Sequence, residues 1–218
     1  MATSKLTLYK GALRVLGQAS IAALTDAVEN RRLLDEAYDE NAIGFTLEQG
    51  NWNFAIRTIE INYDTSVSDP GFSFSRAFSK PSDWKKTVRL ASDEYFSNSM
   101  THREFNDEQQ YWWADIDTIY VQYVSDDSSY GSDLSVWTQA FVNYFEAYLA
   151  SQIVHRVFQS EADVKKVFAL AQNALQIAKS NDAWNEGAKF HAPGGWASAR
   201  RGRGGGHRDR GSRSNLTG

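Results

Sequence analysis

Apolar residues recur at helical spacing in four stretches of the chain, two before residue 50 and two after residue 133. Within each stretch the apolar side chains stand three or four positions apart, which is the pattern of a helix with one face on a core. Thr25 or Asp26 is placed to cap the second helix, and Ser160 precedes two acids that suit the first turn of the fourth. The predicted helices cover residues 5–17, 27–49, 134–158 and 161–180.

Between residues 52 and 125 the apolar period shortens to two, which is the spacing of a strand with one buried face. Lys80 to Lys86 breaks the alternation and, with Pro81 or Ser82 near its start, predicts a helical turn. The predicted strands cover residues 52–63, 72–78, 88–91, 103–105, 110–113 and 118–124. We therefore predict an α+β fold, mainly α, with a four-helix core, an inserted small antiparallel β-sheet at about 52–125 and an extended C-terminal arm.

The last 34 residues, 185–218, differ in composition from the rest. They hold nine of the 15 glycines and seven of the 23 lysines and arginines but only two acids, so they carry a charge of +5. The remaining 184 residues hold 16 bases and 25 acids, a charge of −9. A basic, glycine-rich segment cannot bury enough apolar surface to order itself. The sequence therefore predicts an acidic body, residues 1–184, followed by an arm that grips a partner.

Side chains that could perform catalysis are few. The chain has no cysteine, which excludes disulfides, thiolate metal sites and thiol nucleophiles. Of the four histidines, two lie in the arm, His155 lies in an apolar helical stretch, and His102 has no second histidine at metal-ligand spacing. No nucleophile elbow, phosphate loop or dinucleotide fingerprint occurs, and the acids at 115–117 and 126–127 lack calcium-loop spacing. We expect no enzymatic activity, no cofactor and no metal, and no apolar run is long enough to span a membrane.

Two features leave a choice of binding partner open. Trp112 and Trp113, with the phenylalanines at 72–78, either stack on sugars or form a sheet face that packs on the helices. The arginine–glycine segment at 200–213 is similar to arms that bind RNA phosphates. It is equally suited to docking on a protein, with Phe190 and Trp196 as anchors in pockets and arginines paired with carboxylates. A merely solubilising extension is the third reading.

The order of these segments resembles the head-to-tail adaptor proteins of tailed bacteriophages, the tail tubular protein A-like connectors. The resemblance covers about 180 residues, and the Gly/Arg-rich ending is not a fixed feature of that family. The stretches that carry it are Leu6 to Gly17 with Leu24-Thr25-Asp26, Asn30 to Tyr38, Gly50-Asn51-Trp52-Asn53-Phe54-Ala55, Phe78 to Trp84 with its aromatic-x-x-Pro-x-Asp turn, Phe141 to Ala150, and Leu170 to Ala178.

The resemblance implies a non-enzymatic virion protein, made in the cytoplasm of a bacterial host and located at the head–tail interface. Such proteins assemble as a ring, a dodecamer in the family, between the portal protein and the tail tube or nozzle, and genomic DNA passes through the lumen. An acidic body repeated around that ring would repel DNA and let it slide. The arm residues that we expect to dock on the portal are Phe190, Trp196, Arg200, Arg201, Arg203, Arg208, Arg210 and Arg213.

Overall fold

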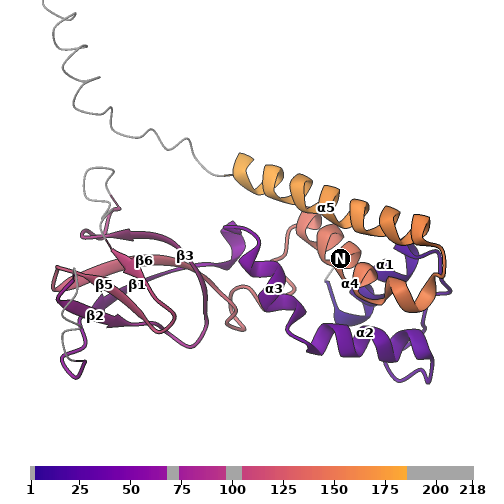
Figure 1. Ribbon diagram of the computed structural model, residues 1–218, viewed down its shortest axis with the longest axis horizontal. Helices are drawn as coiled ribbons and strands as arrows, with labels where there is room; N and C mark the ends of the chain where they lie inside the picture. The colour runs from indigo at the N-terminus through magenta and orange to yellow at the C-terminus, as the bar shows by residue number, and fades with distance from the viewer. Residues whose placement is uncertain (1–2, 68–73, 97–104, 186–218) are drawn as a thin grey trace, which may run out of the picture.

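The computed structural model describes residues 3–67, 74–96 and 105–185, and these form an α+β fold. The helices gather at one end of an elongated molecule and the strands at the other (Figure 1). The described residues contain five α-helices, α1 (Lys5–Val15), α2 (Glu29–Asp39), α3 (Ala42–Glu48), α4 (Gln139–Val157) and α5 (Glu161–Trp184). The α+β class predicted from the sequence is confirmed.

The predicted helix over residues 27–49 is wrong as a single element, because the chain breaks between α2 and α3. Asn41 has a φ of 65°, in the left-handed region that an asparagine tolerates and a continuing helix cannot use. The predicted cap is also wrong. Val28 is the N-cap of α2, and the Asp26 carboxylate instead accepts hydrogen bonds from the N–H groups of Ala22 and Ala23.

The closing pair of helices is confirmed with shifted ends. α4 begins at Gln139 rather than residue 134, because the Thr138 hydroxyl accepts the N–H of Phe141 and caps the helix there. α5 follows Ser160, as predicted, and extends to Trp184, four residues beyond the expected end. Ser160 is the N-cap by position, but its side chain makes no capping hydrogen bond.

The apolar core at the helical end surrounds α4, which contacts α1, α2 and α5. Four aromatic rings form its centre, with the Phe141 ring centroid 4.8 Å from those of both Trp52 and Trp137, and the Phe145 centroid 4.9 Å from that of Trp137. The indole nitrogens are satisfied, since Trp52 donates to the carbonyl of Thr46 and Trp137 to that of Gly131. All five helices contribute buried residues, so the predicted four-helix core is not confirmed in that form.

The β insertion is confirmed, but it forms two three-stranded antiparallel sheets in the described residues rather than one. Side chains of both sheets, among them Phe78, Leu90, Trp112 and Tyr123, share a second core. One sheet has the order β1 (Ile56–Asn62), β6 (Thr118–Ser125), β3 (Trp84–Ala91), and the other the order β2 (Arg76–Ser79), β5 (Tyr111–Ala114), β4 (Asn106–Asp107).

Three local predictions in this region differ from the structure. Residues 53–55 form a turn of 3-10 helix, η1 (Asn53–Ala55), so the first strand begins only at Ile56. The helical turn predicted at residues 80–86 is a short turn at 82–83, and β3 starts at Trp84. The start of the stretch predicted at 72–78 lies outside the described residues, as does most of that at 103–105.

Candidate partner-binding surfaces

The eight arm residues predicted to dock, Phe190 to Arg213, all lie outside the described residues. The structure therefore brings none of them together, and it describes the point from which the arm departs. That point is the end of α5, where Trp184 is 84% exposed.

α5 is held at both ends of its length. Val164, Val167 and Ala178 are buried in the helical core. In the last turn the buried carboxylate of Asp182 accepts the backbone N–H of Asn53 at 3.2 Å, and the Asn53 amide donates to the Asp182 carbonyl at 2.9 Å. These bonds join the C-terminal end of α5 to the turn that precedes β1, so the arm departs from a fixed position near the junction of helices and sheets (Figure 1).

One face of α5 exposes three large apolar side chains at a spacing of seven residues. Leu170 and Ile177 are each 52% exposed and Trp184 is 84% exposed. Since seven residues are close to two helical turns, the three side chains lie along one line on the helix. We call this line the α5 stripe. The sequence contained its signal, but Leu170 and Ile177 flank the predicted buried stripe and were not recognised as a separate exposed face.

A groove of about 410 Å³ runs beside the α5 stripe, between α5 and the first turns of α4. Its polar lining consists of amide side chains, those of Gln139 and Asn143 on α4 and of Asn173 and Asn181 on α5. No lysine, arginine or carboxylate lines it. Depletion of charge at an apolar surface is typical of the centre of a protein–protein interface, whereas phosphate binding requires cations.

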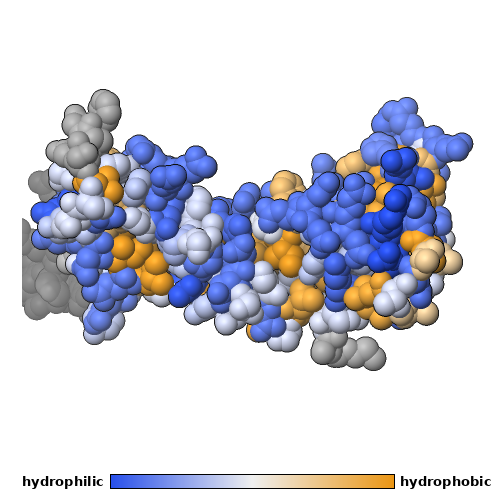
Figure 2. Space-filling model, turned by 90° about the horizontal axis from the view of Figure 1, so that it is seen from below, coloured by the Kyte–Doolittle hydropathy of each residue, from blue (hydrophilic) through white to orange (hydrophobic). Residues whose placement is uncertain are grey.

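A second candidate surface lies on the side of the molecule formed by α2 and α3. Figure 2 shows that side as mainly hydrophilic, with hydrophobic patches between the charged groups. Val28 and Phe45 are 48% and 45% exposed, and the Phe45 ring stacks on Tyr148 at 5.2 Å between centroids. The apolar side chains here do not follow one line, in contrast to the α5 stripe.

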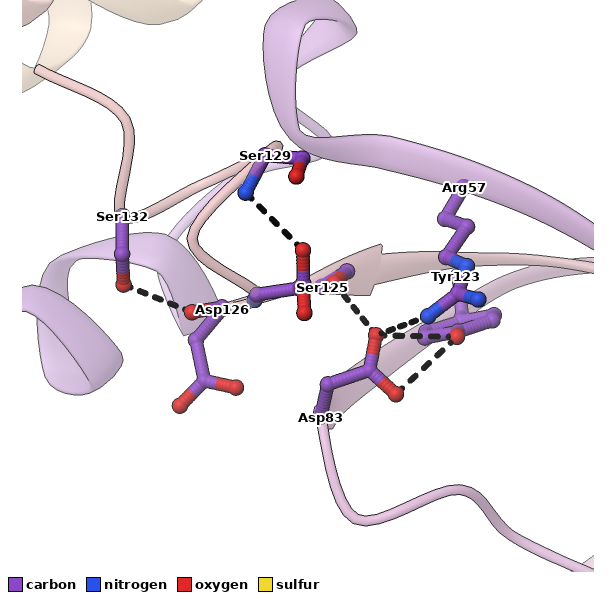
Figure 3. A network of polar contacts seen from close by, with 8 residues as sticks. Arg57, Asp83, Tyr123, Ser125, Asp126, Ser129 and Ser132 are labelled. Atoms are coloured by element: carbon purple, nitrogen blue, oxygen red, sulfur yellow. Dashed lines mark hydrogen bonds and ion pairs between the residues drawn. The ribbon is translucent and has the colours of Figure 1, made fainter.

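A polar network at the junction of sheets and helices centres on Asp83, which lies just before β3 (Figure 3). Its carboxylate accepts hydrogen bonds from Arg57 at 2.9 Å, from the Tyr123 hydroxyl at 3.0 and 3.2 Å, and from the Ser125 hydroxyl at 2.5 Å. Burial acts to raise the pKa of Asp83, but the bonds from Ser125, Arg57 and Tyr123 outweigh it and lower that pKa below 3.8. The pKa of Tyr123 is raised, first by burial and then by the bond to Asp83. Fully satisfied groups of this kind fix geometry and do not offer a reactive centre.

The loop after β6 continues this network. Lys85 pairs with the Asp126 carboxylate at 2.7 Å, and the Ser132 hydroxyl donates to the Asp126 carbonyl at 2.6 Å. The Asp127 carboxylate accepts the N–H of Ser129 at 2.8 Å. The acids at 126–127 are therefore used to shape a turn. Asp115 and Asp117 instead tie the turn between β5 and β6 to the start of β2, since Asp115 accepts from Ser75 and Asp117 pairs with Arg76.

A second buried acid, besides Asp182, lies in the helical core. Glu146 of α4 is 6% exposed, packs against Gly11 of α1, and pairs with the exposed Arg14 at 3.2 Å. Burial raises the pKa of Glu146, and the charge of Arg14 offsets this only in part. A β-carbon at position 11 would lie 1.9 Å from the Glu146 carboxyl carbon, so a glycine is needed there for close approach.

The other residues that the sequence suggested for catalysis or binding either have structural roles or lie outside the described residues. His155 is exposed on α4 beside Phe168, and His102, His191 and His207 are not described. Trp112 is fully buried and Trp113 is 8% exposed, so neither presents a ring face for sugar stacking. They pack within the β part, and not on the helices as predicted. No group of three or more metal-ligating side chains occurs in the part of the chain that the structure describes.

Comparison with models of known protein families and with curated proteins gives no match. Across residues 3–67, 74–96 and 105–185, no helix is long and apolar enough to cross a membrane.

Proposed function

We propose that the chain is a structural virion protein of the head-to-tail adaptor kind, which forms a ring between a portal and a tail and lets DNA pass through its lumen. The observation that carries the proposal is the departure of a basic, glycine-rich arm from a fixed point between two different ends of one body. A connector has to meet two unlike partners, and a helical end and a β end supply two unlike surfaces. The arm adds a third contact, which can reach beyond the body.

The arm is proposed to dock on the portal protein. Fully extended, 34 residues reach roughly 110 Å, so an arm can cross neighbouring subunits before it docks. Phe190 and Trp196 provide apolar anchors, and Arg200, Arg201 and Arg203 provide pairs for carboxylates. Arg208, Arg210 and Arg213 add weaker electrostatic contacts. Because a basic, glycine-rich segment pays its ordering entropy when it docks, assembly on the portal would be sequential.

The body is proposed to line a channel that DNA does not adhere to. Its charge of −9, repeated around a ring, gives a negative field that opposes phosphate binding. A channel wall that proves to be basic in an assembled ring would contradict this part of the proposal.

The experiment that tests the proposal is electron microscopy of portal rings from the same source, mixed with the full-length chain. An additional ring at one end of the portal, with the rotational symmetry of an oligomer of this chain, is the expected result. The control replaces Phe190 and Trp196 by alanine, which we expect to remove the additional ring while leaving the body folded. Portal rings that stay bare at saturating concentrations of the full chain would refute the adaptor role.

The irregular arginine–glycine units at 200–213 favour a second candidate, binding of RNA or another nucleic acid by the arm. That function predicts binding whose strength falls with salt, with a slope of about −0.7 per phosphate contacted on a single strand. Replacing Arg200, Arg201 and Arg203 by glutamine should then reduce the slope, and an unchanged slope would exclude the arm as the site.

A further inference from the structure

We propose that two copies of this chain pair through the α5 stripe, with the two α5 helices antiparallel and a two-fold axis at Ile177. The pairing is independent of the adaptor role, because it rests on the body alone. Its premise is the exposure of Leu170, Ile177 and Trp184 on one line of a helix that has another side buried.

The α5 stripe is complementary to itself when it is reversed. Leu170 and Trp184 lie seven residues on either side of Ile177, and Asn173 and Asn181 lie four residues on either side. In an antiparallel pair centred on Ile177, each Leu170 therefore meets Trp184 of the second copy, and each Asn173 meets Asn181. Apolar groups face apolar groups, and amides, which both donate and accept, face amides. Such self-complementarity is what an isologous two-fold interface requires.

The surface around the α5 stripe lacks charged side chains, as the centre of a protein–protein interface does and a solvated helix face usually does not. Among the α5 residues that line the groove, and in Trp184 beyond them, there is no charged side chain. Asp163 and Lys166 share this side of the helix but lie before Leu170, outside the segment 170–184, and they pair with each other. Glu161 pairs with Lys165, Lys179 lines a different pocket, and Asp182 is buried. Between Leu170 and Trp184 a nucleic acid would find no cation on this face, so the observations favour a protein surface of the same composition.

The groove beside the stripe gives each Trp184 a place to bind. It is bounded by Leu170 on α5 and by Ala140 and Asn143 on α4, and its volume is about 410 Å³. Leu170 is the residue that reversal brings opposite Trp184 of the second copy. An exposed tryptophan that enters an apolar groove is the common anchor of protein interfaces, and covering it removes on the order of 200 Å² from water.

A contact made by one helix over four turns is at the small end of specific interfaces, so we expect a dissociation constant of about 1–100 μM. The pair is therefore reversible. The antiparallel arrangement sends the two arms away from opposite ends of the contact.

The test uses single cysteines in the full-length chain, which has no cysteine of its own. Under mild oxidation Ile177→Cys is expected to form a disulfide-linked dimer, because the two copies of residue 177 meet at the axis. Leu170→Cys alone is expected to stay monomeric, since its two copies are about 21 Å apart along antiparallel helices. A mixture of Leu170→Cys with Trp184→Cys is expected to form the heterodimer.

Gln172→Cys is the matched control, because Gln172 is also exposed and lies on the side of α5 away from the stripe. Self-linkage of Leu170→Cys would overturn the proposal in favour of a parallel pair. Linkage of Ile177→Cys no faster than that of Gln172→Cys would overturn self-pairing altogether and leave the stripe to another protein or to the arm.

A measurement without cross-links keeps the proposal testable if a cysteine variant folds poorly. Sedimentation velocity of the unmodified chain should show a monomer–dimer equilibrium, and Ile177→Glu should raise its dissociation constant at least about tenfold, a loss of 1.4 kcal/mol. Gln176→Glu, which adds the same charge on another side of the same helix, should leave the constant unchanged. Equal effects of the two variants would contradict the α5 stripe as the contact.

Discussion

Replacing Asp83 by alanine removes the acceptor at the centre of the polar junction. Three donors lose their partner at once, namely Arg57, the Tyr123 hydroxyl and the Ser125 hydroxyl. Tyr123 and Ser125 are fully buried, so water cannot easily replace the lost acceptor, whereas Arg57 keeps 37% of its side chain exposed.

The expected loss of unfolding free energy follows from how far each of these three donors is exposed. A buried hydroxyl left without an acceptor costs about 1–3 kcal/mol, and two such groups are affected. The exposed part of Arg57 is screened by solvent, so its pair contributes on the order of 0–1 kcal/mol. We therefore expect Asp83→Ala to lower the free energy of unfolding by roughly 2–7 kcal/mol, a large share of the 5–15 kcal/mol typical of a domain.

The assay is urea unfolding followed by tryptophan fluorescence, at neutral pH and at acid pH. The pKa of Asp83 is lowered on folding, so its contribution is fully present above the ordinary value of 3.8 and is lost as the pH falls through the lowered value. The difference between wild type and Asp83→Ala should shrink accordingly in acid. Glu60→Ala, an exposed acid on β1, is the control and should stay within about 0.5 kcal/mol of wild type at both pH values.

A difference of less than about 1 kcal/mol at neutral pH would refute the reasoning, because a satisfied buried network cannot lose its central acceptor at so small a cost. A second check is the cycle of Asp83→Asn with Tyr123→Phe. Because the two side chains share a hydrogen bond, the double variant should lose less unfolding free energy than the sum of the losses of the two single variants.

Three further predictions concern the helical end. Gly11→Ala should lower the free energy of unfolding by roughly 1–3 kcal/mol through its clash with the Glu146 carboxyl group, and a Glu146→Ala background should remove that cost in the same urea assay. Because the pKa of Glu146 is raised on folding, wild type should lose stability relative to Glu146→Gln as the pH rises above 4.5 through the raised value, and thermal unfolding across pH would contradict this if the two curves ran parallel. Asn41→Val should cost about 1–2 kcal/mol because a branched side chain is strained at a φ of 65°, while Asn41→Gly should stay near wild type; equal stabilities would show that the break between α2 and α3 tolerates any residue.

Helical spacing predicted the closing helices well because their apolar faces are long and continuous. The same reasoning predicted α2 and α3 as one helix, because the apolar spacing of 3.6 continues by chance across residues 40 and 41. That spacing gives no sign of the single left-handed residue, Asn41, which separates the two helices. The start of α4 was misplaced for a related reason. Val136 and Trp137 fit the apolar stripe, but Thr138 supplies the cap.

The alternation of apolar and polar residues predicted strands in the insertion. It could not show which strands share a sheet, because strand pairing depends on contacts between residues that are far apart in the sequence. β3 pairs with β6 and β5 with β2, across 25 or more residues in each case. The turn at Pro81 looked helical because Trp84, Lys85 and Lys86 follow it without alternation. In the structure they belong to a strand with register shifts.

The site was predicted less completely than the fold. The arm was recognised by its composition, and its docking residues remain a prediction because they lie outside the described residues. The α5 stripe could have been found from its spacing of seven, but exposure cannot be read from a sequence in which Leu170 and Ile177 adjoin buried Ala171 and Ala178. The network around Asp83 joins residues 57, 83, 123 and 125, which no local pattern relates.

Co-sedimentation with portal rings from the same source tests the central claim most directly, with the full-length chain compared with a chain that ends at Trp184. The adaptor account predicts saturable binding by the full-length chain and none by the shortened chain, which should still unfold cooperatively. Equal binding by both chains would contradict a grip through the arm. Binding by neither would contradict the adaptor role itself.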